Sequence, residues 1–388
     1  MTLVYLVAGE ASGDILGARL IAALRARRPD LRVAGIGGAR MQAEGLVSLF
    51  PMEELSLMGL AEVLPSLARL IRRMGEAEAD ILTQRPAALV TIDAPSFTLR
   101  LAARVRPKGV RVVHYVAPQV WAWRPWRVKR IAASVDRLLC LLPFEPSFFA
   151  KAGIDARFVG HPILEGAVAG DANAFRQRNG IAADAKVLVV MPGSRGGELN
   201  RHLPVFGAAI DRLREAVPGF APVALALPRH VARIEAAWPR IPVLSADGEK
   251  RDALAAATAA LVKSGTSSLE VALAGVPQVV AYKVNPITAA IVRRLVKVRH
   301  ASLVNILATT PAIPELIQEA CTGETLAATL APLLADPAAA AAQHAAYAEA
   351  RAALSPPGGQ QPSEAAADAV LAAIDEKTGF TGGLDGRA

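Results

Sequence analysis

The chain has 388 residues, of which 53% are hydrophobic and 20% are charged, and its formal net charge is +8. This composition excludes a wholly disordered chain, and at about 100–200 residues per domain the length predicts two domains. The positive charge favours an anionic partner but does not choose among nucleic acid, anionic lipid and phosphate ligands. Cys140 and Cys321 are too few for a disulfide scaffold or a structural zinc site.

The start of the chain is not typical of a secretion signal, because Met1–Ala8 is too short for an apolar core before Gly9. No uncharged apolar stretch reaches the ~18 residues of a membrane-spanning helix. We therefore expect a chain that is soluble or lies on a membrane surface. None of the six histidines has metal-binding spacing, and we expect chemistry without a metal or a cofactor.

In the first half of the chain, short β-rich runs alternate with Ala-, Leu- and Arg-rich helical stretches, the first helix over residues 14–27. Continuous apolar strands separated by helices are typical of a parallel sheet with helices on both faces. Strands are predicted at Leu3–Val7, Arg32–Ile36, Ala88–Ile92, Val110–Val116 and Arg137–Leu142.

The alternation stops in a polar, irregular stretch at 162–181 and then restarts. We therefore predict two doubly wound, Rossmann-like α/β domains facing each other across a cleft, over residues 1–170 and 171–354. After a predicted helix at 336–353, a break and a helix at 363–374 lead to a Gly-rich tail, and residues 355–388 are expected to complete the first domain. Strands of the second half are predicted at Lys186–Met191, Val223–Leu227, Val243–Ser245, Ala259–Lys263 and Gln278–Lys283.

Two turns in the first half carry candidate chemistry. Asp93 ends an apolar strand, and a carboxylate at the C-terminal edge of a parallel sheet points into the ligand crevice. It can serve as a general base, with capping of the next helix as the alternative. Gly9 and Gly13 permit close backbone approach before a helix N-terminus, which favours anions. An ordinary strand-to-helix turn is the alternative, since the spacing fits neither dinucleotide nor P-loop motifs.

Three of the four tryptophans fall between residues 121 and 130 together with four cations. Aromatic rings beside cations suit a headgroup or phosphate site at an interface, and a loop anchored by Trp is the alternative. We single out Trp121 and Arg124 as candidate acceptor or phosphate ligands. The residues of this segment are Trp121, Trp123, Trp126, Arg124, Arg127, Lys129 and Arg130.

Two Gly- and Ser-rich loops follow strands in the second half. In 192–198 (PGSRGGE), exposed backbone N–H groups and the planar fork of Arg195 suit phosphate oxygens. In 263–270 (KSGTSSLE), hydroxyls and amides at a helix start can hold a diphosphate, and Glu270 can accept hydrogen bonds from a ribose diol. A plain turn and helix capping by Thr266 or Ser267 are the respective alternatives.

Two basic stretches combine cations with apolar neighbours, as helices on membrane surfaces do. The first contains Arg69, Arg72 and Arg73, and a solvated helix face is the alternative for both. No nucleic-acid motif accompanies the charge, so a nucleic-acid partner is not expected. The second stretch contains Arg293, Arg294, Lys297, Arg299 and His300.

From Tyr5 to Gln318 these motifs resemble bacterial lipid-A-disaccharide synthases. The matching stretches include VAGEASGDILGARLI, IDAPSF, HYVAPQVWAWR, LPFE, PGSRGGE and SGTSSLE. The resemblance implies the two-domain glycosyltransferase B fold and an inverting, metal-independent transfer of 2,3-diacylglucosamine from UDP-2,3-diacylglucosamine to 2,3-diacylglucosamine 1-phosphate. It also implies a location on the cytoplasmic face of the inner membrane, and some members of the family form homodimers.

The resemblance also implies roles for residues. Asp93 matches the essential carboxylate of the family and is expected to be the general base. Ser96 stands where a second Asp is common, so a two-carboxylate mechanism is not expected. Gly13, Trp121 and Arg124 stay candidates for the acceptor or its phosphate. The expected UDP-binding residues are Gly193, Ser194, Arg195, Glu198, Gly265, Thr266, Ser267, Glu270 and Asn305.

Two other functions remain open from the residues. A UDP-sugar 2-epimerase shares the expected fold and nucleotide-binding half, although it would not need the Trp- and Arg-rich segment. A non-catalytic protein of the membrane surface fits the charge, although it would not explain the two phosphate-type loops.

Overall fold

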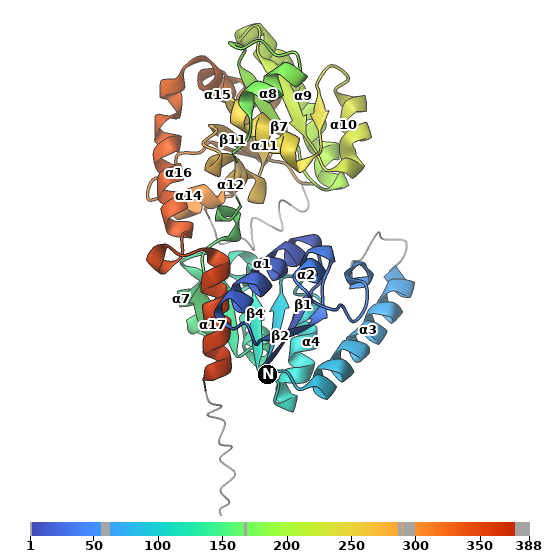
Figure 1. Ribbon diagram of the computed structural model, residues 1–388. Coiled ribbons are helices and arrows are strands. Elements are labelled where there is room, and N and C mark those ends of the chain that lie inside the picture. Colours follow the sequence, from blue (N-terminus) through green and yellow to red (C-terminus); the bar gives the residue numbers. More distant parts are fainter. Residues whose placement is uncertain (1, 56–62, 167–168, 286–288, 290–298, 377–388) are drawn as a thin grey trace, which may run out of the picture. The chain divides into compact units, whose positions relative to one another are not determined.

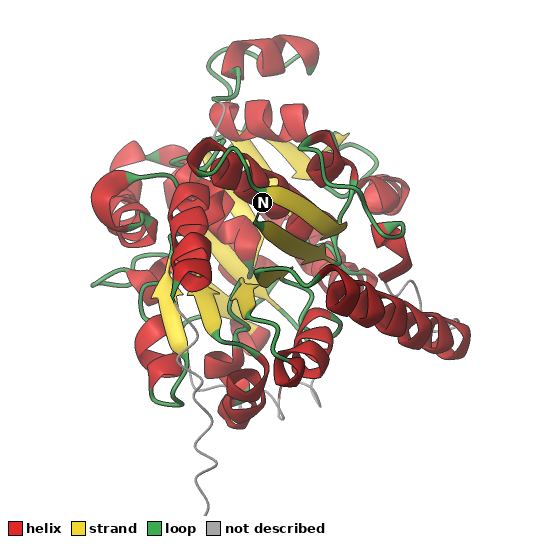
Figure 2. Ribbon diagram, turned by 60° about the horizontal axis from the view of Figure 1, so that its bottom comes forward, coloured by secondary structure: helices red, strands yellow, loops and turns green. Residues whose placement is uncertain are grey.

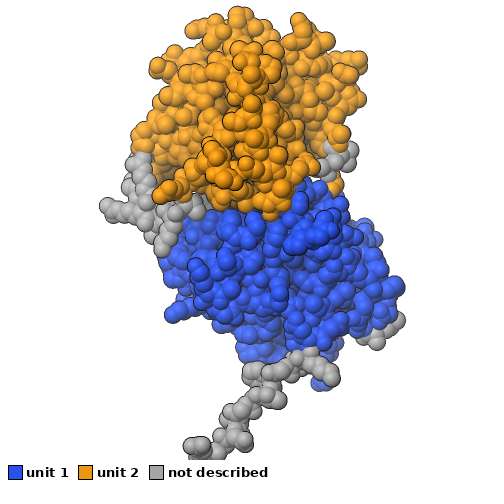
Figure 3. All heavy atoms as spheres, turned by 90° about the vertical axis from the view of Figure 1, so that its left-hand side faces the viewer, with its two compact units in different colours: residues 1–165, 354–388 blue, residues 166–353 orange. Residues whose placement is uncertain are grey.

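The computed structural model describes residues 2–55, 63–166, 169–285, 289 and 299–376. The chain forms two compact units (Figure 3). Unit 1 comprises Met1–Glu165 together with Leu354–Ala388, and unit 2 comprises Gly166–Ala353. The chain therefore leaves unit 1 after one long segment, builds unit 2, and returns to unit 1 with its last residues.

Unit 1 is built on a six-stranded parallel sheet in the order β2-β1-β3-β4-β5-β6. Figure 1 labels β1, β2 and β4 of this sheet. The order reverses between β1 and β3, which pair directly with Tyr5 opposite Leu89. Ligand crevices of open α/β sheets form beyond the carboxyl ends of strands at such a switch point. The strands are β1 Leu3–Ala8, β2 Arg32–Ile36, β3 Ala88–Ile92, β4 Val112–Tyr115, β5 Arg137–Cys140 and β6 Asp155–Phe158.

Helices pack on both faces of this sheet, so β1 and β3 are almost completely buried. The last helix, α17, belongs to the same core, because Ala366, Ala367 and Val370 lie in the apolar cluster around the sheet. Their small side chains permit close approach to α1. The helices are α1 Ala11–Arg27, α2 Ala39–Ala43, α3 Val63–Gln84, α4 Thr98–Val105, α5 Val120–Trp123, α6 Val128–Ser134, α7 Glu145–Ala150 and α17 Pro362–Asp375.

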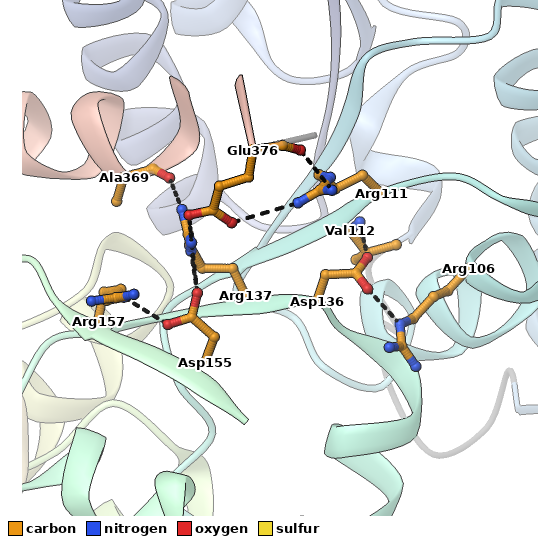
Figure 4. A network of polar contacts seen from close by, with 9 residues as sticks. All are labelled: Arg106, Arg111, Val112, Asp136, Arg137, Asp155, Arg157, Ala369 and Glu376. Carbon is orange, nitrogen blue, oxygen red and sulfur yellow. Dashed lines mark hydrogen bonds and ion pairs between the residues drawn. The ribbon is translucent and has the colours of Figure 1, made fainter. Parts of the chain in front are cut away.

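A buried arginine fastens the C-terminal segment to the sheet of unit 1 (Figure 4). Arg137 in β5 is 3% exposed and donates to Asp155 Oδ2 at 2.7 Å, to the carbonyl of Ala369 at 2.9 Å and to Glu376 Oε1 at 2.6 Å. Arg111 also donates to the carbonyl oxygen of Glu376, at 3.1 Å. One guanidinium thus joins two strands to both the body and the end of α17.

Unit 2 contains a second six-stranded parallel sheet, in the order β12-β11-β10-β7-β8-β9. Alternate residues of β7 enter different apolar clusters, Leu188 one and Val189 the other, so helices cover both faces of the sheet (Figure 2). The strands are β7 Val187–Met191, β8 Ala221–Leu225, β9 Val243–Leu244, β10 Ala259–Lys263, β11 Gln278–Tyr282 and β12 Glu315–Ile317. The helices are α8 Ala172–Arg178, α9 Gly196–Ala216, α10 Val231–Ala237, α11 Asp247–Ala256, α12 Thr266–Leu273, α14 Leu303–Leu307, α15 Gly323–Ala335 and α16 Ala341–Leu354.

The α/β class with two parallel sheets is confirmed, and each predicted strand is present. Arg32–Ile36, Ala88–Ile92 and Ala259–Lys263 have the predicted ends, and the other strands have shifted ends. The strand predicted at 110–116 is shorter, and the one predicted at 223–227 begins earlier. The edge strands β6 and β12 were not predicted, because they are short and carry charged residues. The predicted tail at 378–388 lies outside the described residues. Within the described chain, no single helix is long and apolar enough to cross a membrane. The helices Gly323–Ala335 and Pro337–Leu354 together have the length and composition of a membrane span, but they are bent by 113° relative to each other.

Candidate active site

Asp93 lies at the carboxyl end of β3 on strained backbone. Asp93 and Ala94 have φ of 48° and 44°, a left-handed region that costs about 1–3 kcal/mol for a non-glycine residue. Hydrogen bonds from Asp93 N to the carbonyl of Tyr115 and from Thr98 Oγ1 to the carbonyl of Asp93 hold this turn. The capping alternative is wrong, because Phe97 occupies the N-cap of α4. The half-buried carboxylate instead accepts a long hydrogen bond, 3.5 Å, from Ser12 Oγ.

Gly13 lets the backbone pack closely on the sheet, and its predicted contact with the acceptor or its phosphate stays a prediction. It is buried, and a Cβ atom there would lie 3.2 Å from Ala8 Cβ and 3.4 Å from the carbonyl oxygen of Ile92. The glycine therefore lets the start of α1 lie directly on the sheet. The next residue, Asp14, accepts N–H groups from Gly38, Arg40 and Met41 and so caps α2, a role that the sequence did not reveal.

Trp121 anchors its segment from within, as the alternative interpretation held. Its indole Nε1 donates to Glu145 Oε1 at 2.9 Å, and its ring packs edge-on against Phe144. Glu145 is 2% exposed and also accepts the N–H groups of Leu141 and Leu142. Burial raises the pKa of Glu145 to about 7. Trp121 therefore stabilises the fold of this segment, and the exposed aromatic and basic side chains of the segment follow it in the chain.

The exposed part of this segment combines two indoles with cations. Trp123 is 40% and Trp126 is 61% exposed, and the guanidinium of Arg124 lies 3.8 Å from the centre of the Trp123 ring. Within the described part of the chain, no ion pair involves any cation between residues 124 and 130. We call residues 123–130 the aromatic-basic surface; it is suited to anionic groups next to apolar ones.

The basic stretch on α3 is largely engaged inside unit 1. Arg73 binds Glu54 at 2.6 Å and Glu76 at 2.5 Å and stacks over Phe50, while Arg72 pairs with Glu76. These ion pairs favour the solvated-face alternative for this helix. Of the second stretch, Arg293, Arg294 and Lys297 lie outside the described residues.

In unit 2, a pocket opens at the carboxyl ends of β7, β8, β9 and β10. Gly193, Ser194 and Ser267 from the two predicted loops line it, as do Lys250 and Lys263. β7 and β10 are neighbours in the sheet, so both loops start at one edge. The N-termini of α9 and α12, with their partial positive charge, follow these loops directly.

Glu198 braces the first loop. Its Oε2 accepts the N–H groups of Ser194 at 3.0 Å and Arg195 at 3.3 Å, and its Oε1 lies 3.3 Å from Lys263 Nζ. Burial alone would raise the pKa of Glu198, but the N–H group of Ser194 and the Lys263 ammonium outweigh it and hold the pKa below its usual value. Gly193, with φ of 135°, permits this turn, since a Cβ there would approach Glu198 Oε2 to 2.8 Å.

The brace changes which groups of the loop can meet a phosphate. Glu198 already occupies the N–H groups of Ser194 and Arg195, so Glu198 is expected to support the loop rather than bind a ligand. The first-turn N–H groups of α9, at Gly196 and Gly197, have no partner within the helix. The Arg195 guanidinium lies 3.7 Å from Glu198 Oε1, but its side chain is 79% exposed and can also reach an anion.

His202 in α9 connects this loop to Lys283, which follows β11 at the same carboxyl edge of the sheet, a contact that the sequence did not indicate. It is fully buried; its Nδ1 lies 2.7 Å from the carbonyl oxygen of Pro192, and its Nε2 lies 3.0 Å from the N–H of Lys283. A backbone N–H can only donate, so Nε2 accepts and Nδ1 carries the proton. Burial lowers the pKa of His202, consistent with a neutral ring.

The second loop turns into α12 through Gly265, whose φ is 143°. Gly265 is the N-cap and no side chain caps the helix, so capping by Thr266 or Ser267 is wrong. Both residues lie in the first turn of the helix, where the backbone N–H groups have no acceptor within the helix. Glu270, one turn later, forms an ion pair with Lys250, which places this carboxylate beside the pocket.

The side chain of Asn305 is held by hydrogen bonds within unit 2, and its predicted nucleotide contact stays a prediction. It is 3% exposed; its amide nitrogen donates to the carbonyl of Ile313 and to Glu315, and its oxygen accepts from the N–H groups of Ala312 and Ile313. A nucleotide contact would have to replace these bonds. Asn305 therefore stabilises the conformation of residues 303–315 by linking α14 to Ala312, Ile313 and Glu315.

Comparisons with known proteins agree with these features. Residues 4–370 match the family model described as lipid-A-disaccharide synthetase. The chain is 50% identical over 378 residues to the lipid-A-disaccharide synthase of Gluconobacter oxydans (strain 621H), covering 96% of this chain and 91% of that protein. It is 47% identical over 384 residues to that of Rhodospirillum centenum (strain ATCC 51521 / SW), covering 97% and 95%.

Solved structures show the same fold at low identity. A UDP-GlcNAc 2-epimerase from Neisseria meningitidis bound to UDP-GlcNAc matches with a TM-score of 0.65 and 11% identity, covering 96% of this chain and 100% of that one. The calicheamicin glycosyltransferase CalG4 matches with a TM-score of 0.58 and 16% identity, covering 97% and 99%. These likenesses place the two units in the glycosyltransferase B fold.

Proposed function

The chain belongs to the lipid-A-disaccharide synthetase family, and from this premise we propose how its two units share the reaction. The protein is a glycosyltransferase of lipid A disaccharide synthesis. Unit 2 binds the donor UDP-2,3-diacylglucosamine, and unit 1 binds the acceptor 2,3-diacylglucosamine 1-phosphate. The products are the disaccharide 1-phosphate and UDP.

One observation carries the donor assignment: two loops that suit phosphate border a single pocket at the carboxyl ends of β7 and β10. The helix N-termini behind the loops offer free N–H groups to an anion, and Arg195 supplies an exposed fork of donors. Leu225, Leu227 and Leu244 give the pocket apolar walls that suit a nucleobase. A nucleoside diphosphate satisfies both halves of this lining.

Asp93 is the general base of the proposed reaction. It takes the proton of the acceptor 6-hydroxyl as that oxygen attacks the anomeric carbon, a contribution of typically about 10²–10⁴-fold. The bond to UDP breaks in the same step, and its electron pair leaves with the diphosphate. Arg195 and the first-turn amides of α9 and α12 stabilise the growing negative charge. A single displacement inverts the anomeric centre.

The aromatic-basic surface is proposed to meet the membrane from which the acylated acceptor is drawn, on the cytoplasmic face of the inner membrane. Trp123 and Trp126 are suited to the headgroup level of a bilayer, and Arg127 and Lys129 to anionic lipid. Replacing both tryptophans by alanine should reduce sedimentation with phosphatidylglycerol vesicles, while neutral phosphatidylcholine vesicles show little binding in either case. Unchanged sedimentation would remove this surface from the proposal.

The test of the proposed function is UDP release from UDP-2,3-diacylglucosamine in detergent, with and without the monosaccharide 1-phosphate acceptor. Acceptor-dependent release together with a disaccharide product is expected. A UDP-sugar 2-epimerase would instead change the donor sugar without needing an acceptor. Absence of both reactions in folded protein that still binds vesicles would favour a non-catalytic membrane protein.

A further inference from the structure

Lys263, the last residue of β10, places an ammonium group in the lining of the pocket. It lines the pocket together with Ser194 and Ser267, and its side chain is only 17% exposed. A Cβ on Gly265 would lie 3.0 Å from Lys263 Nζ, so the ammonium lies against the start of α12. Lys263 opens the 263–270 motif, but the sequence pointed to the hydroxyls, the amides and Glu270 of that motif as ligands and not to this lysine.

The ammonium has more donors than the structure uses. A lysine carries three N–H donors and no acceptor, and among the described residues Glu198 is the one acidic side chain paired with it, at 3.3 Å. Glu198 is itself shared, since its other oxygen accepts the N–H groups of Ser194 and Arg195. Lys263 therefore has donor capacity left over in a place that is largely closed to bulk water.

The surroundings favour an additional anion beside this cation. The N-termini of α9, with 21 residues, and α12, with eight, adjoin the loops on both sides, and each contributes partial positive charge. Lys250 lines the same pocket and is matched by Glu270. Asp247 also lines the pocket, so the positive charge that a diphosphate would meet comes from both lysines, the exposed Arg195 and the two helix ends together.

We propose that Lys263 is a diphosphate-binding residue of the donor site, held ready by Glu198 and shared with the phosphate oxygens when the donor binds. In the reaction, its ammonium would balance charge that grows on the departing diphosphate. This inference rests on the proposed donor site in unit 2. Glu198 then has two tasks, to fix the loop through Oε2 and to aim Lys263 through Oε1.

Calorimetric titration of UDP and of uridine against the full chain tests this inference. Lys263→Met should weaken UDP binding on the order of 10- to 100-fold, as loss of a charge-assisted hydrogen bond does, and leave uridine binding within about twofold. Lys186→Met, at the opposite end of β7, makes the same change of charge in unit 2 and should leave both affinities unchanged. With acceptor present, Lys263→Met should lower kcat as well as raise KM, because the charge grows in the transition state.

The outcomes separate the inference from the proposed function. An equal loss of UDP and uridine affinity, or no loss of either, would overturn the role of Lys263 while leaving the donor site in place. Wild-type protein that binds neither compound would contradict the donor site itself. If Lys263→Met does not fold, Lys263→Gln, which keeps a polar stem, gives the same comparison.

Discussion

At the scale of single residues, the proposed base is set apart by its backbone. Asp93 and its neighbour Ala94 both have positive φ, and such strain in non-glycine residues concentrates at functional sites. The turn places the carboxylate 3.5 Å from Ser12 Oγ, and the N-cap of α4 is Phe97. The preceding apolar strand predicted the position of Asp93 at the end of β3. The positive φ angles of Asp93 and Ala94 could not be predicted, because the hydrophobic pattern of a sequence does not specify backbone dihedral angles.

Replacing Asp93 by asparagine should lower kcat by about 10²–10⁴-fold, because an amide cannot accept the acceptor's proton. UDP affinity should stay within a few-fold, since Asp93 and the pocket belong to different units. Steady-state kinetics and UDP titration on the same preparation provide the measurement. Ser96→Ala is the matched control, and activity close to wild type is expected. A drop in UDP affinity that equals the drop in kcat would argue against the base role.

The lysines and His202 show what single residues could not reveal in advance. The glycines and serines after β7 and β10 predicted two phosphate-type loops because they occur together in short stretches. Lys263 meets Glu198, and His202 meets Lys283, only because β7, β10 and β11 lie next to one another in the sheet. The order of the strands in the sheet is a property of the fold, and it cannot be predicted from the periodicity of residues along the chain.

At the scale of elements, α9 does more than cover the sheet. Its first turn carries the brace of the phosphate-type loop, and one turn later His202 ties the loop to the end of β11. The helix is 21 residues long and its buried face packs against α15 in one apolar cluster. A long helix fixed at its far end is a rigid support for short bonds at its start.

His202→Phe should lower the unfolding free energy of unit 2 by about 1–3 kcal/mol, because two buried backbone groups lose their partners. His202→Gln, whose amide also donates and accepts, should recover much of this loss. Since the folded pKa lies below the usual 6.5, the histidine stabilises the fold fully above about pH 6.5 and loses that contribution as the pH falls.

Urea unfolding of the wild type and His202→Gln at pH 7.5 and pH 5.5 measures this effect. The wild type should lose more stability between the two pH values than the variant, because glutamine does not titrate. His114 in unit 1, whose pKa burial lowers to about 4, contributes equally to both proteins and cancels in the comparison. An identical pH dependence would show that protonation of His202 is not coupled to folding.

At the scale of the whole molecule, unit 1 is discontinuous in sequence, and Arg137 is one of the links that close it (Figure 4). The guanidinium is almost completely buried, whereas Asp155 and Glu376 are partly exposed. Loss of the arginine would leave the part-buried carbonyl of Ala369 and two carboxylates without their shared donor. Arg137 thus adds a buried polar contact to the apolar cluster and to the ion pairs of Arg27 and Arg28 that also hold α17 on unit 1.

Arg137→Met should destabilise unit 1 by about 1–3 kcal/mol, the usual effect of removing hydrogen bonds to charged groups. Arg157→Met is the control, because its exposed ion pair with Asp155 is worth at most about 1 kcal/mol. Both are best measured in a Trp238→Phe background, in which the remaining three tryptophans all lie in unit 1 and report its unfolding by fluorescence. Equal unfolding midpoints for the two arginine variants would contradict this role of Arg137.

The return of α17 to the first sheet also fixes an order of events during synthesis. The helix that completes unit 1 leaves the ribosome after all of Gly166–Ala353, which at about 5–20 residues per second takes on the order of 10–40 s. Throughout that interval the surface that Ala366, Ala367 and Val370 later cover is open on the nascent chain. Unit 2 can therefore finish folding before unit 1. Unit 1 keeps an apolar face uncovered until α17, the last helix, has been synthesised.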